Sequence, residues 1–470
     1  MHATDQRRQL QRAVLEHAGF AAADAQAWSR DHPASSGDPA TDNARFSAFW
    51  RLTAKLLAQL PARSTRNADQ QAAAEQLLAG ARDARERFLG THARSVYDTL
   101  TEARAHFLRA DALCERAALA YPGLVPDRTT LEHERARPLR AKDGHEIDQG
   151  LLLAHVLADP VAGMHLCHAM LLPREQSLAR LPELERRGAV ELDAASVRRE
   201  GRASIVTLRN PRFLNAEDET TLDDAETAVD LALLDPATEL CVLRGSTVEH
   251  PKYAGRRLFG AGINLTHLYL GRVPYLFYLL RDLGCVNKIY RGLAHNDVSP
   301  EETRGRTIEK PWIATVDGFA IGGHCQYLLV MDYVIAARDA YMTLPARKEG
   351  IIPGAANMRL PRFVGDRIAR QAILLERRLD CDSPEGRLIC DAVVAPDEVD
   401  AALGRAIETF TGSGVVSAAG NRRALRVVQE PLDAFRRYFA VYAREQAYCH
   451  LSPALIANLE RHWNAHQRKP

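Results

Sequence analysis

Two glycine-containing segments could place backbone N–H groups against the same ligand. The first is "FGAGINL" (259–265), with the turn Ala261-Gly262-Ile263, and the second is "DGFAIGGHCQYLL" (317–329), with the pair Gly322-Gly323. In each segment glycine precedes an expected helix, so the backbone can approach a ligand closely and the first helical amides favour negative charge. If two such amides, one from each segment, converge on one carbonyl oxygen, they form an oxyanion hole.

Gln326 follows Gly323 by three residues and gives this region a neutral amide. An amide donates and accepts hydrogen bonds, but it cannot act as a general base near neutral pH. The pattern therefore favours chemistry in which the backbone stabilises an anion and no carboxylate stands at position 326.

Strands and helices must alternate to position these two segments. The stretches at 204–210 and 238–246 are typical of strands, and 218–235 between them is typical of a helix. Further strand patterns follow at 312–322 and 333–338. This alternation indicates α/β architecture.

The regions on either side of this core read as helical. Residues 72–120 place apolar side chains at three- and four-residue intervals, which predicts amphipathic helix up to the break at "YPGLVP" (121–126). A charged stretch at 183–204 marks a boundary, and 431–451 is an aromatic-rich helical tail. We predict an N-terminal helical domain at 1–200, a core at 201–403 and a C-terminal helical region at 404–470 for oligomerisation or as a lid.

Composition and charge argue against several classes of partner. The formal net charge of +1 gives no reason to expect nucleic acid, and no apolar stretch approaches the ~20 residues that span a bilayer. Eight scattered cysteines without a CxxC pair, and no apolar signal segment at the start, fit a cytoplasmic protein. His165 and His168 could share a helix face, but no third ligand lies near them in sequence, so we expect no metal site.

From about residue 202 to 403 the sequence resembles the crotonase (enoyl-CoA hydratase/isomerase) superfamily. The motifs that carry the likeness are, in order, "NPRFLNAEDETTLDDAE", "FGAGINL", "DGFAIGGHCQYLLVMDYVIA" and "PARKEGIIPGAANMRLPRFVGDRIARQAIL" with "DAVVAPDEVDAAL". The resemblance implies an α/β fold with a ββα spiral core that binds acyl-CoA thioesters as a homotrimer or homohexamer. It also implies that the amides of Ile263 and Gly323 stabilise an enolate, and that further substrate contacts come from Ala261, Gly262, Asn264 and Gly322.

Two departures from the superfamily pattern concern carboxylates. Hydratases of the superfamily carry glutamates at the positions of Gln326 and Ala346, and both are missing here. Hydration by the usual mechanism is therefore not expected. Glu349 lies three residues beyond Ala346, a displacement that we expect to point it elsewhere.

These departures and the long helical extension resemble one branch of the superfamily, which oxidises an arylacetyl-CoA with O2 and without metal or flavin. The resemblance implies conversion of 3,5-dihydroxyphenylacetyl-CoA and O2 to 3,5-dihydroxyphenylglyoxylate and CoA, a step of glycopeptide-antibiotic biosynthesis. Two alternatives stay open. One is a hydrolase or decarboxylase of arylacetyl-CoA with the same oxyanion hole, and the other is a non-catalytic acyl-CoA-binding protein.

By position, the resemblance implies roles for four further side chains. Glu217 and Arg281 resemble the polar pair that holds the phenolic hydroxyl groups, whereas a carboxylate at a helix start and a solvated helix arginine are the plain alternatives. Arg212 matches a basic residue that meets CoA phosphates, or is a surface loop residue. Ile351 would line an O2 pocket, or would simply fill the core.

Overall fold

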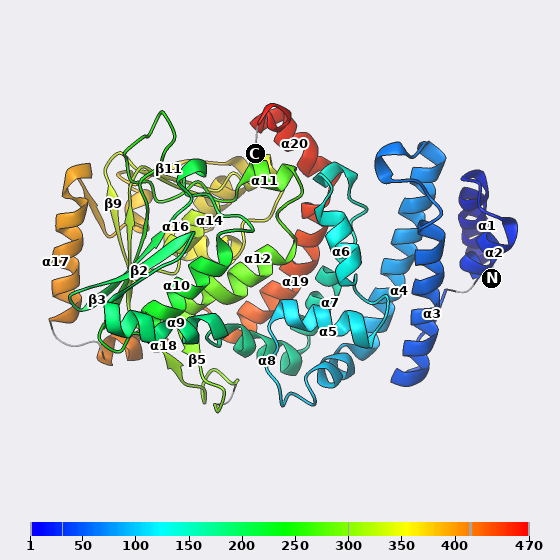
Figure 1. The fold of residues 1–470 in the computed structure, drawn as a ribbon, viewed down its shortest axis with the longest axis horizontal. Helices are drawn as coiled ribbons and strands as arrows, with labels where there is room; N and C mark the ends of the chain where they lie inside the picture. The colour runs from blue at the N-terminus through cyan, green and yellow to red at the C-terminus, as the bar shows by residue number, and fades with distance from the viewer. Residues whose placement is uncertain (1, 31, 299, 413–415, 469–470) are drawn as a thin grey trace. The chain divides into compact units, whose positions relative to one another are not determined.

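Strands with buried faces form the larger sheet of the fold. In the computed structural model, which describes residues 2–30, 32–298, 300–412 and 416–468, seven of the described strands pair in the order β1-β2-β3-β4-β7-β9-β12 (Figure 1). Neighbours run parallel from β3 to β12. A parallel sheet covered by helices needs apolar strands, and β7 is buried along its whole length. The strands are β1 (Ala189–Glu191), β2 (Ala195–Glu200), β3 (Ala203–Leu208), β4 (Leu240–Gly245), β7 (Trp312–Val316), β9 (Tyr333–Ala337) and β12 (Ala392–Val394).

A smaller sheet holds the second strand of each repeat. It runs in the order β11-β10-β8, with β8 (Phe319–Ile321) parallel to β10 (Tyr341–Thr343) and β11 (Leu379–Asp380) antiparallel to β10. The chain therefore repeats the order strand, strand, helix, as β7-β8-α14 and β9-β10-α15, with one strand in each sheet. This confirms the predicted crotonase-like ββα spiral. A separate pair joins β5 (Leu293–Ala294) and β6 (Thr307–Ile308).

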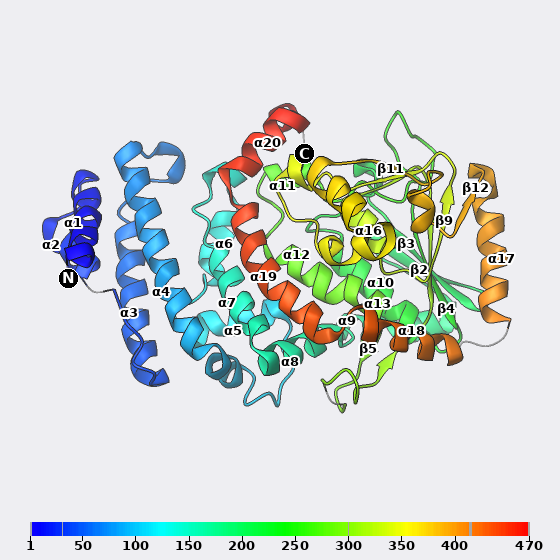
Figure 2. The same cartoon turned by 180° about the vertical axis from the view of Figure 1, so that it is seen from behind.

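Helices cover the large sheet and connect its strands. Helix α10 (Leu222–Leu234) packs on β2 and β3, and α17 (Val399–Thr411) packs on β4 and β9 (Figures 1 and 2). The other helices of this part are α9 (Glu175–Arg187), α11 (Leu265–Tyr269), α12 (Leu276–Leu280), α13 (Val286–Arg291), α14 (Gly323–Leu328), α15 (Ala346–Glu349), α16 (Ala356–Leu375), α18 (Val416–Gln429) and α20 (Pro453–Trp463).

The chain forms two compact units, each built from two stretches of sequence. The first comprises Met1–Leu166 and Phe439–Leu451, and the second Cys167–Tyr438 and Ser452–Pro470. Strands β1 and β2 precede residue 201 and yet pair within the large sheet. The division into domains at residues 200 and 403 stays a prediction. Helices that lie wholly or partly in the first unit are α1 (His2–His17), α2 (Ala22–Arg30), α3 (Pro39–Leu57), α4 (Ala68–Leu100), α5 (Ala110–Ala120), α6 (Arg128–Arg135), α7 (Ile147–Ala158), α8 (Pro160–Leu171) and α19 (Leu432–His450).

The helical pattern of residues 72–120 is interrupted where the sequence predicts continuity. Helix α4 ends at Leu100, and Glu102, Ala103 and Arg104 have φ values of 51°, 54° and 69°. Left-handed backbone is unfavourable for residues with a side chain, so contacts must hold it. His165 Nε2 lies 3.1 Å from the Arg104 carbonyl, and Arg104 Nε lies 3.1 Å from Asp98. The break has no glycine or proline to mark it in the sequence.

Two further observations bear on where the chain can reside. Among the described helices none is by itself long and apolar enough to cross a membrane; one pair, Ile147–Ala158 with Pro160–Arg187, passes the same test together but is bent by 110°. All eight cysteines are free thiols.

A buried carboxylate ties three helices of the second unit together. Glu430, directly after α18, accepts hydrogen bonds from Arg359 at 2.9 and 3.0 Å and from Arg362 at 2.6 Å, and Arg291 lies 3.4 Å away. Burial opposes ionisation of this carboxyl group, but the attraction of Arg359 and its neighbours is larger and lowers the pKa of Glu430 to about 2. The ion cluster therefore joins α13, α16 and the end of α18.

Replacing Glu430 should make the free energy of unfolding less dependent on pH in the acid range. The pKa of this carboxyl group is depressed from 4.5 to about 2, so its contribution is present above pH ~4.5 and is lost as pH falls towards ~2. We expect Glu430→Gln to lower the free energy of unfolding at pH 7 by about 3–5 kcal/mol, because buried guanidinium groups lose their partner. Urea denaturation at pH 7, 5 and 3 measures this, with exposed Glu408→Gln as control. A deficit of equal size at every pH would contradict the account.

Candidate active site

Hydrogen bonds to residue 217 hold the first glycine segment. The N–H of Glu217 donates to the carbonyl of Gly262 at 2.7 Å, and the N–H of Asn264 donates to the carbonyl of Glu217 at 2.8 Å. Gly262 has a φ of +78°, which a residue with a side chain rarely adopts. The N–H of Ile263, between these two bonds, has no acceptor among the described residues.

The second segment ends β8 and begins α14. The N–H of Gly322 donates to the carbonyl of Thr343 at 2.8 Å, whereas the N–H of Gly323 finds no acceptor in the described part of the chain. The two segments touch, since a Cβ built on Gly262 would lie 2.8 Å from the carbonyl oxygen of Ile321. Adjoining segments thus each keep one unused backbone donor, as an oxyanion hole requires.

Arg281 connects the two segments through one buried guanidinium group. Its Nε lies 2.8 and 2.9 Å from the two carboxylate oxygens of Glu217. Its Nη1 donates to Asp282 Oδ1 at 2.7 Å and to Gln326 Oε1 at 3.1 Å, and its Nη2 donates to the carbonyl of Gly323 at 2.6 Å. The structure thus brings Glu217 and Arg281 together with Gly323 and Gln326 of the second segment, across separations of more than forty residues in the sequence.

The ionisation of this cluster follows from the same contacts. Although burial opposes it, the charge of Arg281 keeps the pKa of Glu217 below its usual value. Burial raises the pKa of Asp282. The hydroxyl of Tyr327 donates to Glu217 at 2.9 Å, and its ring centre lies 4.6 Å from the guanidinium carbon of Arg281, within range of a cation–π interaction.

Asp282 and Tyr327 were not predicted from the sequence. The adjacent charges in the apolar stretch "YLFYLLRDLGCV" (275–286) are the pattern that could have indicated Asp282, because charges inside a buried helix need partners. Residues 281–285 form a π-helical turn, a distortion that occurs frequently at functional sites. Tyr327 has no comparable pattern.

His324 supports the first segment through its ring. The N–H of Gly262 donates to His324 Nδ1 at 3.1 Å, so the proton of the neutral ring lies on Nε2. Burial lowers the pKa of His324 to about 4, which leaves the ring uncharged at neutral pH. A Cβ on Gly260 would lie 2.1 Å from this ring. His324 therefore fixes the peptide next to the amide of Ile263.

A cavity of about 640 Å³ lies beside the first segment. This volume falls within the usual range for small-molecule sites. Helix α20 contributes to its wall through His462 and Trp463. The predicted residues that line it are Arg212, Ala261, Ile263 and Asn264.

The ion cluster around Arg281 is not part of this wall. The cluster is connected to the cavity through the backbone of Glu217, which forms an isolated parallel β-bridge with Ile263. Asn264 uses its side chain to cap α11, accepting from the N–H of His267 at 3.2 Å. Ile351 is half-buried and is not among the lining residues, so its place in an O2 pocket stays a prediction.

Glu349 lines the cavity, together with Lys348. The expectation that its position points it elsewhere is wrong, because α15 is a single helical turn from Ala346 to Glu349. Residues three apart on a helix are neighbours on one face. Burial, and then the negative charge of Glu376, raises the pKa of Glu349 to about 7.

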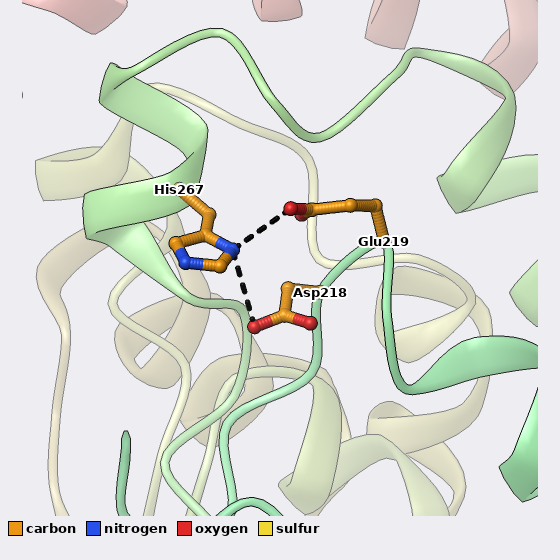
Figure 3. Close-up of side chains that lie close together, drawn as sticks. All are labelled: Asp218, Glu219 and His267. Atoms are coloured by element: carbon orange, nitrogen blue, oxygen red, sulfur yellow. Dashed lines mark ion pairs between the residues drawn. The ribbon is translucent and has the colours of Figure 1, made fainter. Parts of the chain in front are cut away.

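Two carboxylates and one histidine lie close enough together to be tested as ligands of a metal ion (Figure 3). They are Asp218, Glu219 and His267. His267 Nδ1 lies 2.9 Å from Glu219 Oε1 and 3.4 Å from Asp218 Oδ2. The other ring nitrogen of His267, Nε2, lies 3.4 Å from Arg272 Nη1 and can only accept a hydrogen bond from this guanidinium group. The proton of the neutral ring therefore lies on Nδ1, and a metal ion would have to displace it. Asp218 Oδ2 already accepts from two asparagine side chains at 2.8 and 3.1 Å. The group fits a histidine paired with carboxylates better than a metal centre.

Comparison with known proteins decides the family. Residues 284–425 match the enoyl-CoA hydratase/isomerase family. The chain is also 47% identical over 418 residues to the (3,5-dihydroxyphenyl)acetyl-CoA 1,2-dioxygenase of Amycolatopsis orientalis, an alignment that covers 89% of this chain and 95% of that protein. This chain belongs to the crotonase superfamily.

Other crotonase-superfamily relatives match a smaller part of the chain. A probable enoyl-CoA hydratase of Rhizobium meliloti (strain 1021) is 31% identical over 256 residues, which are 53% of this chain and 90% of that protein. A solved enoyl-CoA hydratase/isomerase structure from Xanthobacter autotrophicus Py2 is 22% identical, covers 59% of this chain and 96% of that chain, and has a TM-score of 0.48. The likeness to the dioxygenase therefore reaches well beyond the part that is shared with the hydratase. An acyl-CoA substrate is consistent with these relatives.

Adding a methyl group at Gly323 should disturb the cluster of this crotonase core. A Cβ at this position would lie 2.3 Å from Glu217 Oε2 and 3.0 Å from Arg281 Nη2. We expect Gly323→Ala to lower the free energy of unfolding by about 1–3 kcal/mol, the usual cost of overpacking. Chemical denaturation tests this against Gly404→Ala in α17, where a Cβ would meet nothing within 4 Å and alanine should be neutral or stabilising. Equal stability of the two variants would show that the ion cluster around Arg281 rearranges at no cost to accept the added methyl group.

Proposed function

We propose that this chain is a cofactor-independent dioxygenase that converts (3,5-dihydroxyphenyl)acetyl-CoA and O2 to 3,5-dihydroxyphenylglyoxylate and CoA. The observation that carries the proposal is the 47% identity over 89% of the chain to a dioxygenase of that name. The unused amides of Ile263 and Gly323, and the neutral residues Gln326 and Ala346, support it.

The first chemical step is loss of a proton from the carbon between the aryl ring and the thioester. Both neighbours acidify this carbon, and amides aimed at the thioester oxygen stabilise the enolate more than the substrate. The residues in this role are Ile263 and Gly323, with Ala261, Gly262, Asn264 and Gly322 shaping the backbone around them. Because His324 and Arg281 fix these segments from either side, little reorganisation is needed as charge develops.

The later steps need no redox cofactor. The electron-rich enolate reduces O2 and forms a peroxide at the same carbon, and the outer peroxide oxygen then attacks the thioester carbonyl. The C–S bond breaks and CoA leaves as the thiolate. The remaining Cα–H proton is then lost to water, its electron pair forms the C=O bond of the ketone, and the O–O bond breaks to leave the carboxylate of the keto acid. Both oxygen atoms enter the product. We propose that neither metal nor flavin takes part, since the substrate supplies the electrons.

Two groups of side chains complete the proposed site. Glu217 and Arg281 hold the phenolic hydroxyl groups, and Arg212 meets the CoA phosphates. Gln326 hydrogen-bonds the substrate without adding a negative charge beside the enolate, and Ile351 faces O2. Support for the polar pair is its geometry, although Arg281 also binds Gln326 and Gly323 and so serves the whole site.

We further propose a cytoplasmic homotrimer or homohexamer. The eight free thiols suit a reducing compartment. Exposed apolar side chains support self-association, among them Leu374 and Leu375 at the end of α16 and Val428 on α18, with exposed fractions of 54%, 68% and 82%.

The decisive assay measures two products at once. Purified protein treated with a chelator is mixed with (3,5-dihydroxyphenyl)acetyl-CoA, and O2 uptake and free thiol are recorded together. We expect one O2 consumed for each thiol released, with no loss after chelation. Thiol release without O2 uptake would instead identify a hydrolase or decarboxylase, and neither signal would identify a binding protein. Activity that disappears with the chelator and returns with one metal would refute the cofactor-free mechanism.

Restoring the two hydratase carboxylates should harm this reaction. Gln326→Glu places a carboxylate beside Asp282, because Gln326 Oε1 and Asp282 Oδ2 lie 2.2 and 2.4 Å from the same built Cβ position of Gly354. Ala346→Glu adds a second polar group in a buried position. A negative charge close to the enolate opposes its formation, so we expect the double variant to fold but to lose most O2 uptake and thiol release in parallel.

A size-matched control separates charge from bulk in this experiment. Ala346→Gln introduces a side chain of the same length without a charge, and circular dichroism checks that each variant is folded. Undiminished O2 uptake in the double variant would show that the neutral site is incidental.

A further inference from the structure

Glu349 occupies the place at the cavity where a base is needed. It ends α15, one helical turn after Ala346, and lines the same cavity as Ile263. We propose that Glu349 is the general base that removes the substrate Cα proton, an inference that rests on the proposed function. Helix α15 thus brings a carboxylate to the cavity although position 346 has none.

The surroundings of Glu349 suit this task. Glu376 caps the C-terminal end of α16 and is paired with Lys348 Nζ at 2.6 Å. Burial and the charge of Glu376 raise the pKa of Glu349 to about 7, and a general base works best when its pKa lies near the working pH. Among the described residues of α15, α16 and α20, Lys348 and His462 are the other titratable side chains that line the cavity.

Three other ionisable groups near the two glycine segments are committed elsewhere. Glu217 is bound by both carboxylate oxygens to Arg281, which keeps it ionised but weakly basic. Asp282 accepts from the same guanidinium group and does not line the cavity. His324 uses Nδ1 to accept from the N–H of Gly262, and Nε2 carries its proton. Glu349 alone of these four both lines the cavity and has a pKa near neutrality.

The proton and electron changes balance within this step. A carboxylate oxygen of Glu349 takes the Cα proton, and the electron pair of the broken C–H bond forms the C=C bond of the enolate. The carbonyl π electrons move to the thioester oxygen, where the amides of Ile263 and Gly323 hold them. When CoA later leaves as a thiolate, it takes the proton from Glu349, which restores the carboxylate for the next turnover.

Deuterium exchange without O2 isolates this step from oxidation. The protein is incubated anaerobically with (3,5-dihydroxyphenyl)acetyl-CoA in D2O, and the rate of Cα deuteration is followed by mass spectrometry. Glu349→Gln should slow exchange at least about 100-fold, the usual contribution of a general base, while leaving the dissociation constant of the thioester unchanged. Exposed Glu408→Gln, the same change at a distant helix position, should exchange at the unaltered rate.

A second variant tests the assignment through its pH profile. The exchange rate of the unaltered protein should rise with pH to a plateau, with a midpoint near 7, because the base acts when deprotonated. Glu376→Gln removes the neighbouring negative charge and should move this midpoint to lower pH. Exchange by Glu349→Gln at the unaltered rate, or a midpoint that Glu376→Gln does not move, would overturn the role of Glu349 alone. No exchange by the unaltered protein would overturn the proposed function, and this proposal with it.

Discussion

The buried guanidinium group of Arg281 is the constraint on which the rest of the site depends. A cation removed from water needs an acceptor for nearly every N–H group that it carries. Here the acceptors come from the first segment through Glu217, from the second through Gln326 and the carbonyl of Gly323, and from Asp282 beside it. Moving either segment would strand a buried charge, which is much more costly than losing an exposed ion pair. The positions of the two unused amides are therefore fixed by electrostatics as well as by backbone pairing.

That constraint explains why the two glycine segments tolerate so few side-chain atoms. Gly323 lies against Glu217 and Arg281, and Gly262 lies against the carbonyl of Ile321. The backbones meet because the ββα spiral brings the end of β8 next to the chain that leaves β4, and the parallel sheet sets their register. A site made of main-chain donors thus depends on a rigid scaffold on one side and on one ion cluster on the other.

Local sequence patterns were sufficient to predict the strands and helices of the core. The features that were missed depend on contacts between residues that lie far apart in the sequence. The strand expected at 204–210 is β3 (Ala203–Leu208), the helix at 218–235 is α10 (Leu222–Leu234), and the helix after Gly322 begins at Gly323. The sequence could not indicate that Arg281 would bind Glu217 and Gln326 together, because those partners meet only in the folded chain. The break after Leu100 was missed for the same reason, since His165, far along the sequence, holds its left-handed backbone. Glu349 was misjudged because a displacement of three residues was expected to point it elsewhere, whereas it lies at the end of the single helical turn α15 and lines the cavity.

In the proposed reaction, the position of the carboxylates decides whether the site favours hydration or reaction of the enolate with O2. A carboxylate at 326 would share the guanidinium group already used by Glu217 and Asp282, so an uncompensated charge would lie beside the enolate. At 349 the carboxylate lies at the cavity wall, away from the ion cluster, and its pKa near 7 means that it becomes neutral once it has taken the proton. The negative charge of the reacting group then resides on the enolate, to which the two amides donate hydrogen bonds. In the proposed reaction the species that O2 oxidises is an electron-rich anion with no uncompensated negative charge beside it, and neutral residues at 326 and 346 with a carboxylate at 349 meet that requirement.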